Sequence, residues 1–266
     1  NLSSAPSDIY YLAVSSIGLT SVESDKSNEV MINLADGTTS SLGYNPCAGF
    51  STCGDSCLYN GVTYNTVQIG NQCWFKENLR TTVYRNGDNI FYPGNNNSSW
   101  SYDTSGAYAC WANSMSNCAI YGALYNWYAV NNSNGLCPSG WHVPSNNDYT
   151  DLERETCLLS GNDESTCFAR FPKDEISEGL FGVDEGTKLK SSSWDGTDNY
   201  GFNMIRSGYR HESNGAYYSN IWAFHWTSTD AGSTAWRRLF GAGTPNIQRT
   251  KNAPKARGNS VRCVKN

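Results

Sequence analysis

The length, net charge and cysteine content of the chain narrow the classes of protein to which it can belong. It has 266 residues, a formal net charge of −5 at pH 7 and ten cysteines. We expect neither a nucleic-acid partner, because the net charge is acidic, nor a membrane-spanning segment, because no apolar run approaches the roughly 18 residues that a spanning helix needs. The length allows one large domain or a domain with an extension, and we expect the second.

The first 45 residues differ from the rest of the chain. They contain no cysteine and no tryptophan, and two apolar runs at residues 9–14 and 29–34 are typical of short strands. We therefore predict a strand-rich extension over residues 1–45 and a main domain over residues 46–266. The extension either packs on the main domain or contributes to self-assembly with a neighbouring molecule.

The cysteines indicate disulfides and therefore an extracellular or cell-surface protein. Ten are more than a cytosolic protein usually carries and fewer than a pure disulfide scaffold needs. The segment from Cys53 to Cys57 comes closest to a zinc-binding pair, but no second pair follows at a suitable spacing, so no metal site is predicted. Many pairings remain open, and short separations favour two of them, Cys110 with Cys118 and Cys157 with Cys167.

The elements before the middle of the chain are a hairpin, a loop and a helix. Residues 62–69 and 72–75 alternate as strands around a Gly70-Asn71 turn, which predicts a hairpin. Residues 84–111 show no hydrophobic periodicity, which predicts a long surface loop. Residues 120–128 then place Tyr121, Leu124, Tyr125 and Tyr128 on one helical face, which predicts an amphipathic helix packed on the core.

A rigid corner at residues 136–144 begins the second predicted helix. Pro138 and Pro144 fix the backbone there, and Ser145 can cap the helix with Asp148 three residues later. Apolar and small residues recur at helical spacing along it, at Tyr149, Leu152, Thr156 and Leu159. Within the corner, His142 is expected to be a buried, hydrogen-bonded structural residue.

The last third of the chain changes in charge and in pattern. Residues 162–185 are rich in acids and predict a solvated insertion. From residue 188 onward, short aromatic or β-branched runs alternate with turns, which is typical of a sheet with long loops. Beyond Asp230 there are basic residues but no acids, so we expect a basic C-terminal face.

Six segments resemble the Fibrobacter succinogenes major paralogous domain family, in the same order as in that family. They lie at residues 67–80, 121–127, 137–144, 201–202, 226–229 and 260–263. The resemblance implies a fold similar to the C-type lectin fold and its formylglycine-generating-enzyme branch: α+β, with two helices, a twisted antiparallel sheet, disulfide ties and long surface loops. It also implies a disulfide between Cys137 and Cys263, which would close a long loop and restrict the unfolded chain strongly.

The sequence gives little support for catalysis. Its only histidines are His142, His211 and His225, and it has no nucleophile or phosphate-loop motif. The oxidase branch relies on two C-terminal cysteines, whereas Cys263 is the only cysteine after Cys167 here. We therefore expect no enzyme, and an oxidase is the least favoured of three hypotheses.

No cofactor is expected. Calcium is the one ion whose binding we consider, because proteins with the C-type lectin fold often use it to bind sugar hydroxyls. The sugar-binding Glu-Pro-Asn and Gln-Pro-Asp signatures are absent. Residues 194–199 offer clustered oxygen donors that suit a hard cation. An Asx-rich turn explains them better, so calcium, if bound, would have a structural role.

The favoured hypothesis is a protein that binds a protein or glycan ligand through its C-terminal loops. Rigid rings and adaptable polar groups mix there, as in an antibody paratope, whereas we assign Trp226 and Trp236 to the core. The predicted contact residues are His211, Tyr217, Tyr218, Ile221, Trp222, Phe224, His225, Arg238, Phe240, Asn246, Arg249, Lys251 and Asn252.

Two further ideas concern the setting of these loops. Members of this family serve as variable proteins of diversity-generating retroelements. The sites that resemble rewritten ones in such proteins are His211, Ile221-Trp222, Phe224-His225, Phe240-Gly241-Ala242-Gly243, residues 250–254 and Ala256. A basic C-terminal face would suit an acidic or sulfated ligand. The alternative from another class is a structural subunit of a surface filament or pilus, in which residues 1–45 pair with a neighbour.

Overall fold

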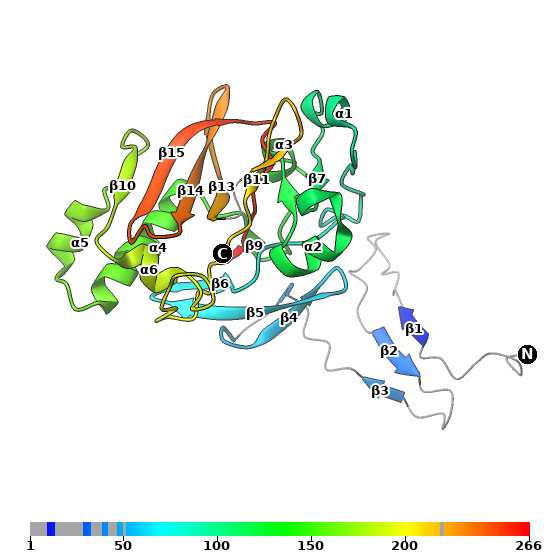
Figure 1. The fold of residues 1–266 in the computed structure, drawn as a ribbon. Coiled ribbons are helices and arrows are strands. Elements are labelled where there is room, and N and C mark those ends of the chain that lie inside the picture. Colours follow the sequence, from blue (N-terminus) through cyan, green and yellow to red (C-terminus); the bar gives the residue numbers. More distant parts are fainter. Residues whose placement is uncertain (1–9, 14–28, 33–38, 42–46, 50–51, 219–220) are drawn as a thin grey trace, which may run out of the picture. The chain divides into compact units, whose positions relative to one another are not determined.

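The structure is a computed structural model that describes residues 10–13, 29–32, 39–41, 47–49, 52–218 and 221–266 (Figure 1). The chain divides into two compact units, residues 1–46 and 47–266. The first unit contains a three-stranded antiparallel sheet in the order β1-β2-β3, formed by β1 Tyr10–Ala13, β2 Glu29–Ile32 and β3 Thr39–Ser41. Strands therefore lie within both predicted runs, whose ends at residues 9, 14, 33 and 34 fall outside the described residues.

The second unit is α+β and is built on two main sheets. Most pairings in both sheets are between antiparallel strands. The first sheet has the order β4-β5-β6-β16-β9, with β4 Ser56–Tyr59, β5 Val62–Ile69, β6 Gln72–Phe75, β16 Val264–Lys265 and β9 Trp141–His142. The second has the order β10-β15-β14-β13, with β10 Gly179–Phe181, β15 Ile247–Pro254, β14 Thr234–Gly241 and β13 Trp222–Ala231.

Two short ribbons and the helices complete this unit. The ribbons pair β7 Tyr108–Ala109 with β8 Leu124–Tyr125, and β11 Tyr209–Arg210 with β12 Tyr217–Tyr218. The described residues contain six α-helices rather than the two predicted, and one 3-10 helix. They are α1 Asn97–Ser101, α2 Met115–Tyr121, α3 Trp127–Val130, α4 Asn146–Leu159, α5 Glu164–Arg170, α6 Glu185–Leu189 and η1 Trp111–Asn113.

The predicted hairpin and the predicted capped helix are both present. Strands β5 and β6 meet at a turn in which Gly70 has a φ of 56°. Helix α4 begins with a full capping box, in which Ser145 Oγ accepts from the Asp148 amide and the Asp148 carboxylate accepts from the Ser145 amide. Its predicted face is buried up to Thr156, whereas Leu159 at its end is exposed. Helix α4 packs on β5, β13 and β14.

The helix predicted over residues 120–128 is wrong, because two residues interrupt it. Gly122 has a φ of 80°, and a Cβ at that position would lie 2.4 Å from the Cβ of Asn78. Helix α2 therefore ends at Tyr121, and the chain enters β8. Asn126 then caps α3 by accepting from the Ala129 amide. The buried aromatic stripe belongs to three short elements that pack together.

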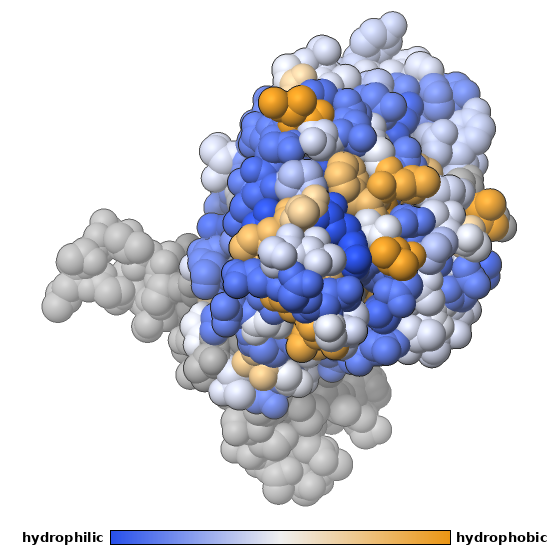
Figure 2. All heavy atoms as spheres, turned by 90° about the vertical axis from the view of Figure 1, so that its left-hand side faces the viewer, coloured by the Kyte–Doolittle hydropathy of each residue, from blue (hydrophilic) through white to orange (hydrophobic). Residues whose placement is uncertain are grey.

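The predicted loop over residues 84–111 is more ordered than expected. It contains α1, β7 and the start of η1, and Trp100 within it is fully buried. The acidic segment over residues 162–185 is also partly integrated into the fold, because β10 pairs with β15 and Glu185 is buried against Arg170. Figure 2 shows the face on this side of the molecule, where hydrophobic residues are scattered among hydrophilic ones.

Five disulfides use all ten cysteines. They join Cys47 to Cys57, Cys53 to Cys73, Cys110 to Cys118, Cys137 to Cys263 and Cys157 to Cys167. The two short bridges favoured by spacing and the long bridge implied by family resemblance are among them. The long bridge spans 126 residues and ties the segment that leads into β9 to the residue before β16, which pairs with β9 in the sheet. Among the described helices, none has the length and apolar character needed to cross a membrane.

Candidate ligand-binding surface

The predicted contact residues do not form one site, because five of them are buried. The structure buries Phe224, His225, Arg238, Phe240 and Arg249, and it also buries Trp226 and Trp236, as predicted. The other predicted residues are partly or fully exposed: His211, Tyr217, Tyr218, Ile221, Trp222, Asn246, Lys251 and Asn252.

Arg238 and Arg249 are corrected from ligand contacts to core residues. Both guanidinium groups bind Glu153 of α4, with Arg238 Nε 2.6 Å from Oε1 and Arg249 Nη2 3.1 Å from Oε2. Arg238 also donates to Asn146 Oδ1 at 2.7 Å. These contacts hold α4 against the second sheet, so neither arginine is free to bind a ligand.

Phe240 and His225 are corrected for a related reason. Phe240 packs in the hydrophobic cluster that contains Trp74, Tyr149 and Ala223. His225 is fully buried, and neither of its ring nitrogens has a hydrogen-bond partner among the described residues. Burial lowers the pKa of His225 well below 6.5, with a smaller contribution from Arg262, so this ring is neutral and inaccessible.

The expected basic face is also corrected. Besides Arg238 and Arg249, the cations of Lys255 and Arg257 are paired, the first with Asp230 and the second with Glu212. Arg262 is buried and donates to backbone and Asn78 oxygens. Most of the C-terminal positive charge therefore stabilises the fold instead of forming a field at the surface.

Five rings on neighbouring strands form a continuous group, which we call the aromatic surface: Tyr209, His211, Tyr218, Trp222 and Phe224. Tyr209 and Tyr218 pair across the β11–β12 ribbon and stack at 5.4 Å between centroids. Tyr209 meets Phe224 edge to face at 4.8 Å, His211 lies 5.5 Å from Tyr218, and Trp222 lies 6.4 Å from Phe224. A parallel bridge between Gly208 and Ala223 joins the ribbon to β13, so the rings extend over both.

The aromatic surface has a buried floor and an exposed rim. Phe224 is the floor, whereas Tyr218 is 40% and Ile221 52% exposed. Arg257 lies over Tyr209 at 5.0 Å while it binds both carboxylate oxygens of Glu212 at 2.7 Å. Tyr209 is therefore held in place beside the exposed Tyr218, as a preorganised contact surface requires.

Arg237 contributes a buried positive charge beneath this surface. Its guanidinium lies 5.2 Å from the Phe224 ring, and its Nη2 donates to Asn252 Oδ1 at 3.3 Å. Its Nε and Nη1 are buried without a hydrogen-bond partner in the described part of the chain. Burial lowers the pKa of Arg237 to about 10, and the nearby Arg257 adds to this effect.

Comparison with known proteins identifies the family. Residues 67–265 match the Fibrobacter succinogenes major domain. The chain belongs to this family. Comparison with curated proteins and with solved structures gives no match. The matched residues of the Fibrobacter succinogenes major domain include every strand of the two main sheets from β6 onward, the aromatic surface and the Cys137–Cys263 disulfide. The resemblance to this family that the six segments indicated is therefore confirmed.

Other predicted contact residues of this Fibrobacter succinogenes major domain lie away from the aromatic surface. Tyr217 points to the other side of the ribbon, where its hydroxyl donates to Asn113 Oδ1 at 2.6 Å. Asn246 donates to the Gly182 carbonyl, and the Lys251 ammonium lies over Trp236 at 5.2 Å. Asn252 Oδ1 accepts from Arg237, whose guanidinium lies 5.2 Å from the Phe224 ring.

Sequence reasoning missed Tyr209 as a member of the aromatic surface, and Arg237 and Arg257 as residues that contact its rings. Tyr209 lies in one of the short aromatic runs that the sequence predicts as sheet, but its place in the surface depends on the β11–β12 pairing and on contact with Phe224, which no local pattern shows. The arginines reach it because β14 and the segment after β15 lie beside the rings. The only available signal was the excess of arginine among the aromatic residues of the last third.

The acids of the turn at residues 194–199, the segment considered for calcium, accept hydrogen bonds from protein donors. Asp195 Oδ2 accepts from the buried Lys190 ammonium at 3.3 Å and from the Gly243 amide. Asp198 Oδ1 accepts from the Asn203 amide at 2.6 Å. Within the described ranges, no three His, Cys, Asp or Glu side chains lie together as metal ligands would. The carboxylates therefore close the turn in the way that an Asx-rich loop does.

His142 has the structural role expected of it, although it is only partly buried. Its Nε2 lies 3.2 Å from Asp148 Oδ2, and its Nδ1 lies 2.6 Å from Asn266 Oδ1. The ring thus connects β9 with the first turn of α4 and with the end of the chain. The hydrogen bond to Asp148 raises the pKa of His142 above 6.5.

Proposed function

We propose that the protein is an extracellular or cell-surface ligand-binding protein, of the adhesin or receptor-like class, with a C-type lectin-like fold. The observation that supports this proposal is the aromatic surface, in which five touching rings include the exposed Tyr218 and the exposed Ile221 directly precedes Trp222. We propose binding and not catalysis as its role, with a protein or glycan as the ligand.

The physical argument rests on preorganisation. Rings offer a large contact area and have few torsions to immobilise, so they lose little entropy when a ligand covers them. Phe224 and the Arg257–Glu212 ion pair support Tyr209 from below and from the side. Aromatic and arginine residues placed in this way are the ones that most often dominate binding energy in interfaces.

The disulfides support the proposed location. Five bridges persist only in an oxidising compartment, which a secreted or surface protein occupies. The bridge between Cys137 and Cys263 joins the middle of the matched domain to its last residues, and the aromatic surface lies on the chain between these two cysteines.

The exposed positions of the surface also suit the proposed variation of the C-terminal loops. Ile221 is exposed and His211 and Trp222 are half-buried, so their side chains can change without opening the core. Phe224, His225 and Phe240 lack this freedom because they are buried. A reverse transcriptase gene beside a near-copy of the last stretch of this gene would establish such variation.

A binding screen with matched variants tests the proposed function. The purified wild-type chain is applied to printed arrays of glycans and of purified cell-surface proteins, together with Trp222→Ala, Ile221→Ser and the control Tyr102→Ala. Tyr102 is an exposed aromatic residue outside the aromatic surface. We expect the strongest ligand to bind Trp222→Ala at least about tenfold more weakly, with an unchanged melting temperature, and Tyr102→Ala normally. Equal binding by all four proteins would contradict the proposal.

A further inference from the structure

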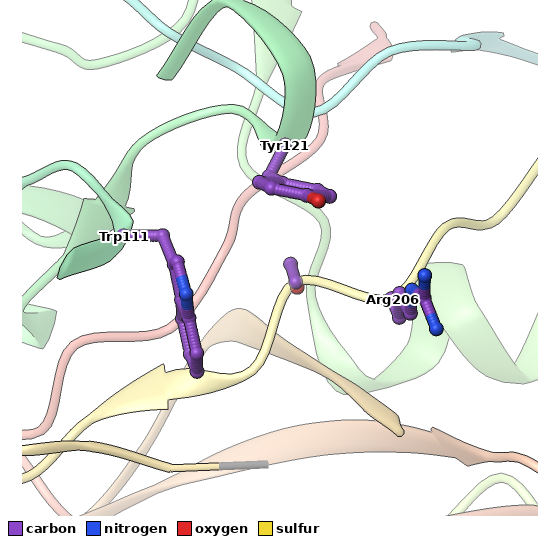
Figure 3. A pocket seen from close by; sticks show the side chains of 4 residues that line it. Trp111, Tyr121 and Arg206 are labelled. Carbon is purple, nitrogen blue, oxygen red and sulfur yellow. The ribbon is translucent and has the colours of Figure 1, made fainter. Parts of the chain in front are cut away.

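A small pocket lies near the β11–β12 ribbon, on the side to which Tyr217 points, because Trp111 in its lining contacts the Tyr217 ring. It has a volume of about 160 Å³ and is lined by Trp111, Tyr121, Arg206 and Ser207. Figure 3 shows the Trp111 and Tyr121 side chains on two separate segments, with Tyr121 at the end of helix α2. Arg206 lies on a third, extended segment, which also passes near Tyr121. A cavity of about 150 Å³ accommodates a benzene ring, so this pocket accommodates one six-membered ring.

We propose that this pocket binds a single anionic sugar ring, one that carries a carboxylate or a sulfate group. The apolar face of the sugar would stack on the Trp111 and Tyr121 rings, and its anionic group would pair with the Arg206 guanidinium. The proposal goes beyond the proposed function, because it assigns a second site with its own chemistry.

The two rings of the pocket are fixed relative to each other by covalent structure. Cys110, which precedes Trp111, forms a disulfide with Cys118, which lies three residues before Tyr121 in α2. Trp111 is also held from behind by an edge-to-face contact with Tyr217 at 5.5 Å. Both aromatic walls are therefore in position before any ligand arrives.

The backbone after Trp111 has a conformation that side chains rarely adopt. Ala112 and Asn113 have φ values of 54° and 55° in succession. Each such residue is strained, and strain of this kind tends to occur where a neighbouring side chain must be held for a purpose. The hydrogen bond from the Tyr217 hydroxyl to Asn113 Oδ1 helps to hold this turn.

The polar groups of the pocket indicate an anion and a hydroxyl-bearing ligand. Arg206 is exposed, and the lining residues that the structure describes include this one cation and no carboxylate. Ser207 is 5% exposed, and its Oγ has no hydrogen-bond partner among the described residues. A guanidinium binds carboxylates and sulfates through paired hydrogen bonds, and a hydroxyl can both donate to and accept from a sugar hydroxyl.

A sugar can form more favourable contacts with the pocket residues than an aromatic side chain can. A pyranose presents C–H groups to the rings and hydroxyls at its edge, so it can satisfy Ser207 Oγ while it stacks. An aromatic side chain has no group that could hydrogen-bond to Ser207 Oγ, which is already buried and unpaired, so it would leave that cost in place. The positive charge of Arg206 then selects an anionic sugar over a neutral one.

The proposal is tested by titrating the whole chain with four named probes, using saturation-transfer NMR or calorimetry. Glucuronic acid and galactose 6-sulfate supply the two anionic groups, glucose is the neutral match, and benzoate is the aromatic match. We expect one or both anionic sugars to bind at least about tenfold more tightly than glucose and than benzoate. Whichever anionic sugar binds more tightly identifies the group that the pocket prefers.

Matched variants assign the binding to the pocket. Arg206→Gln should reduce anionic-sugar affinity to the level of glucose, whereas Lys173→Gln, which removes an exposed cation from outside the pocket, should leave it unchanged. Tyr121→Ala should weaken all the sugars, and Trp222→Ala none, which separates this site from the aromatic surface. Equal binding of glucuronic acid, galactose 6-sulfate and glucose, no effect of Arg206→Gln, or tighter binding of benzoate would each overturn the proposal.

Discussion

Glu153 of α4 and Arg238 of β14 form a hydrogen-bonded ion pair in the interior, with 2.6 Å between Oε1 and Nε and almost no exposure of either side chain. The second carboxylate oxygen binds Arg249 of β15. Asn146 and Thr150 accept further hydrogen bonds from these guanidinium groups. One carboxylate thus holds two cations from adjacent strands, and through them α4 is attached to the sheet that carries the aromatic surface.

Removing the charge of Glu153 should be strongly destabilising. In Glu153→Gln, Arg238 and Arg249 would remain buried without a counter-ion, so we expect a loss of about 3–5 kcal/mol in the free energy of unfolding. Urea unfolding followed by circular dichroism measures this loss. The control Glu175→Gln removes an exposed carboxylate and should change stability by less than about 0.5 kcal/mol. Similar values for the two variants would show that the buried cluster does not hold α4.

The parts of the fold that the sequence predicted correctly depend on neighbouring residues. The β5–β6 hairpin follows from alternation around Gly70-Asn71, and the start of α4 follows from Ser145 and Asp148. The two short disulfides follow from cysteines only 8 and 10 residues apart. In each case the forces that decide the structure act within about one turn or one loop.

The parts that were predicted wrongly depend on distant residues. Arg238 looks like an exposed loop cation in the sequence, but its partner Glu153 lies 85 residues earlier. Phe240 is flanked by glycine, yet it is buried because β14 lies beneath α4 in the middle of a sheet. The pocket residues Trp111 and Arg206 are also brought together only by the fold, so no local pattern could predict them.

The long disulfide should contribute more to stability than a short one. In the chain-entropy model, a bridge that spans 126 residues stabilises by about 5 kcal/mol, and one that spans 10 residues by about 3 kcal/mol. The double variant Cys137→Ala/Cys263→Ala should therefore lose about 2 kcal/mol more than Cys157→Ala/Cys167→Ala. Urea unfolding under non-reducing conditions compares them. An equal loss would mean that the unfolded chain is not restricted as the model assumes.

Two histidines should make stability depend on pH in opposite directions. The pKa of His142 is raised above 6.5, so its contribution is complete below pH 6.5 and is lost as the pH rises through its folded pKa. The pKa of His225 is lowered by burial, so the unfolded chain takes up a proton there below pH 6.5 while the folded chain does not. Stability should therefore fall on both sides of about pH 6.5.

Single variants separate the two branches of this pH profile. Melting temperatures measured from pH 5 to pH 8.5 should decline less above pH 6.5 for His142→Gln than for the wild type, and less below pH 6.5 for His225→Leu. Tyr102→Ala is the control, because it changes an exposed residue and leaves both histidines in place. An unchanged alkaline branch in His142→Gln would show that its contact with Asp148 does not contribute in solution.

Gly241 should be required for the position of Trp222 on the aromatic surface. The backbone of Gly241 lies against the indole ring, and a Cβ there would be only 2.6 Å from the ring edge. The φ of Gly241 is not in the left-handed region, so the restriction comes from space alone. In Gly241→Ala the rigid indole must move away from its place beside Phe224, and we expect a loss of about 1–2 kcal/mol in stability.

A double-mutant cycle tests this contact and connects it with binding. In a Trp222→Ala background the added methyl group meets no ring, so Gly241→Ala should have little further effect, and the coupling energy should be about 1 kcal/mol or more. With the ligand found by the array screen, Gly241→Ala should bind as weakly as Trp222→Ala, because both remove the indole from the rim. Additive losses in stability, or full binding by Gly241→Ala, would show that the indole does not need this place beside Phe224 for contact with the ligand.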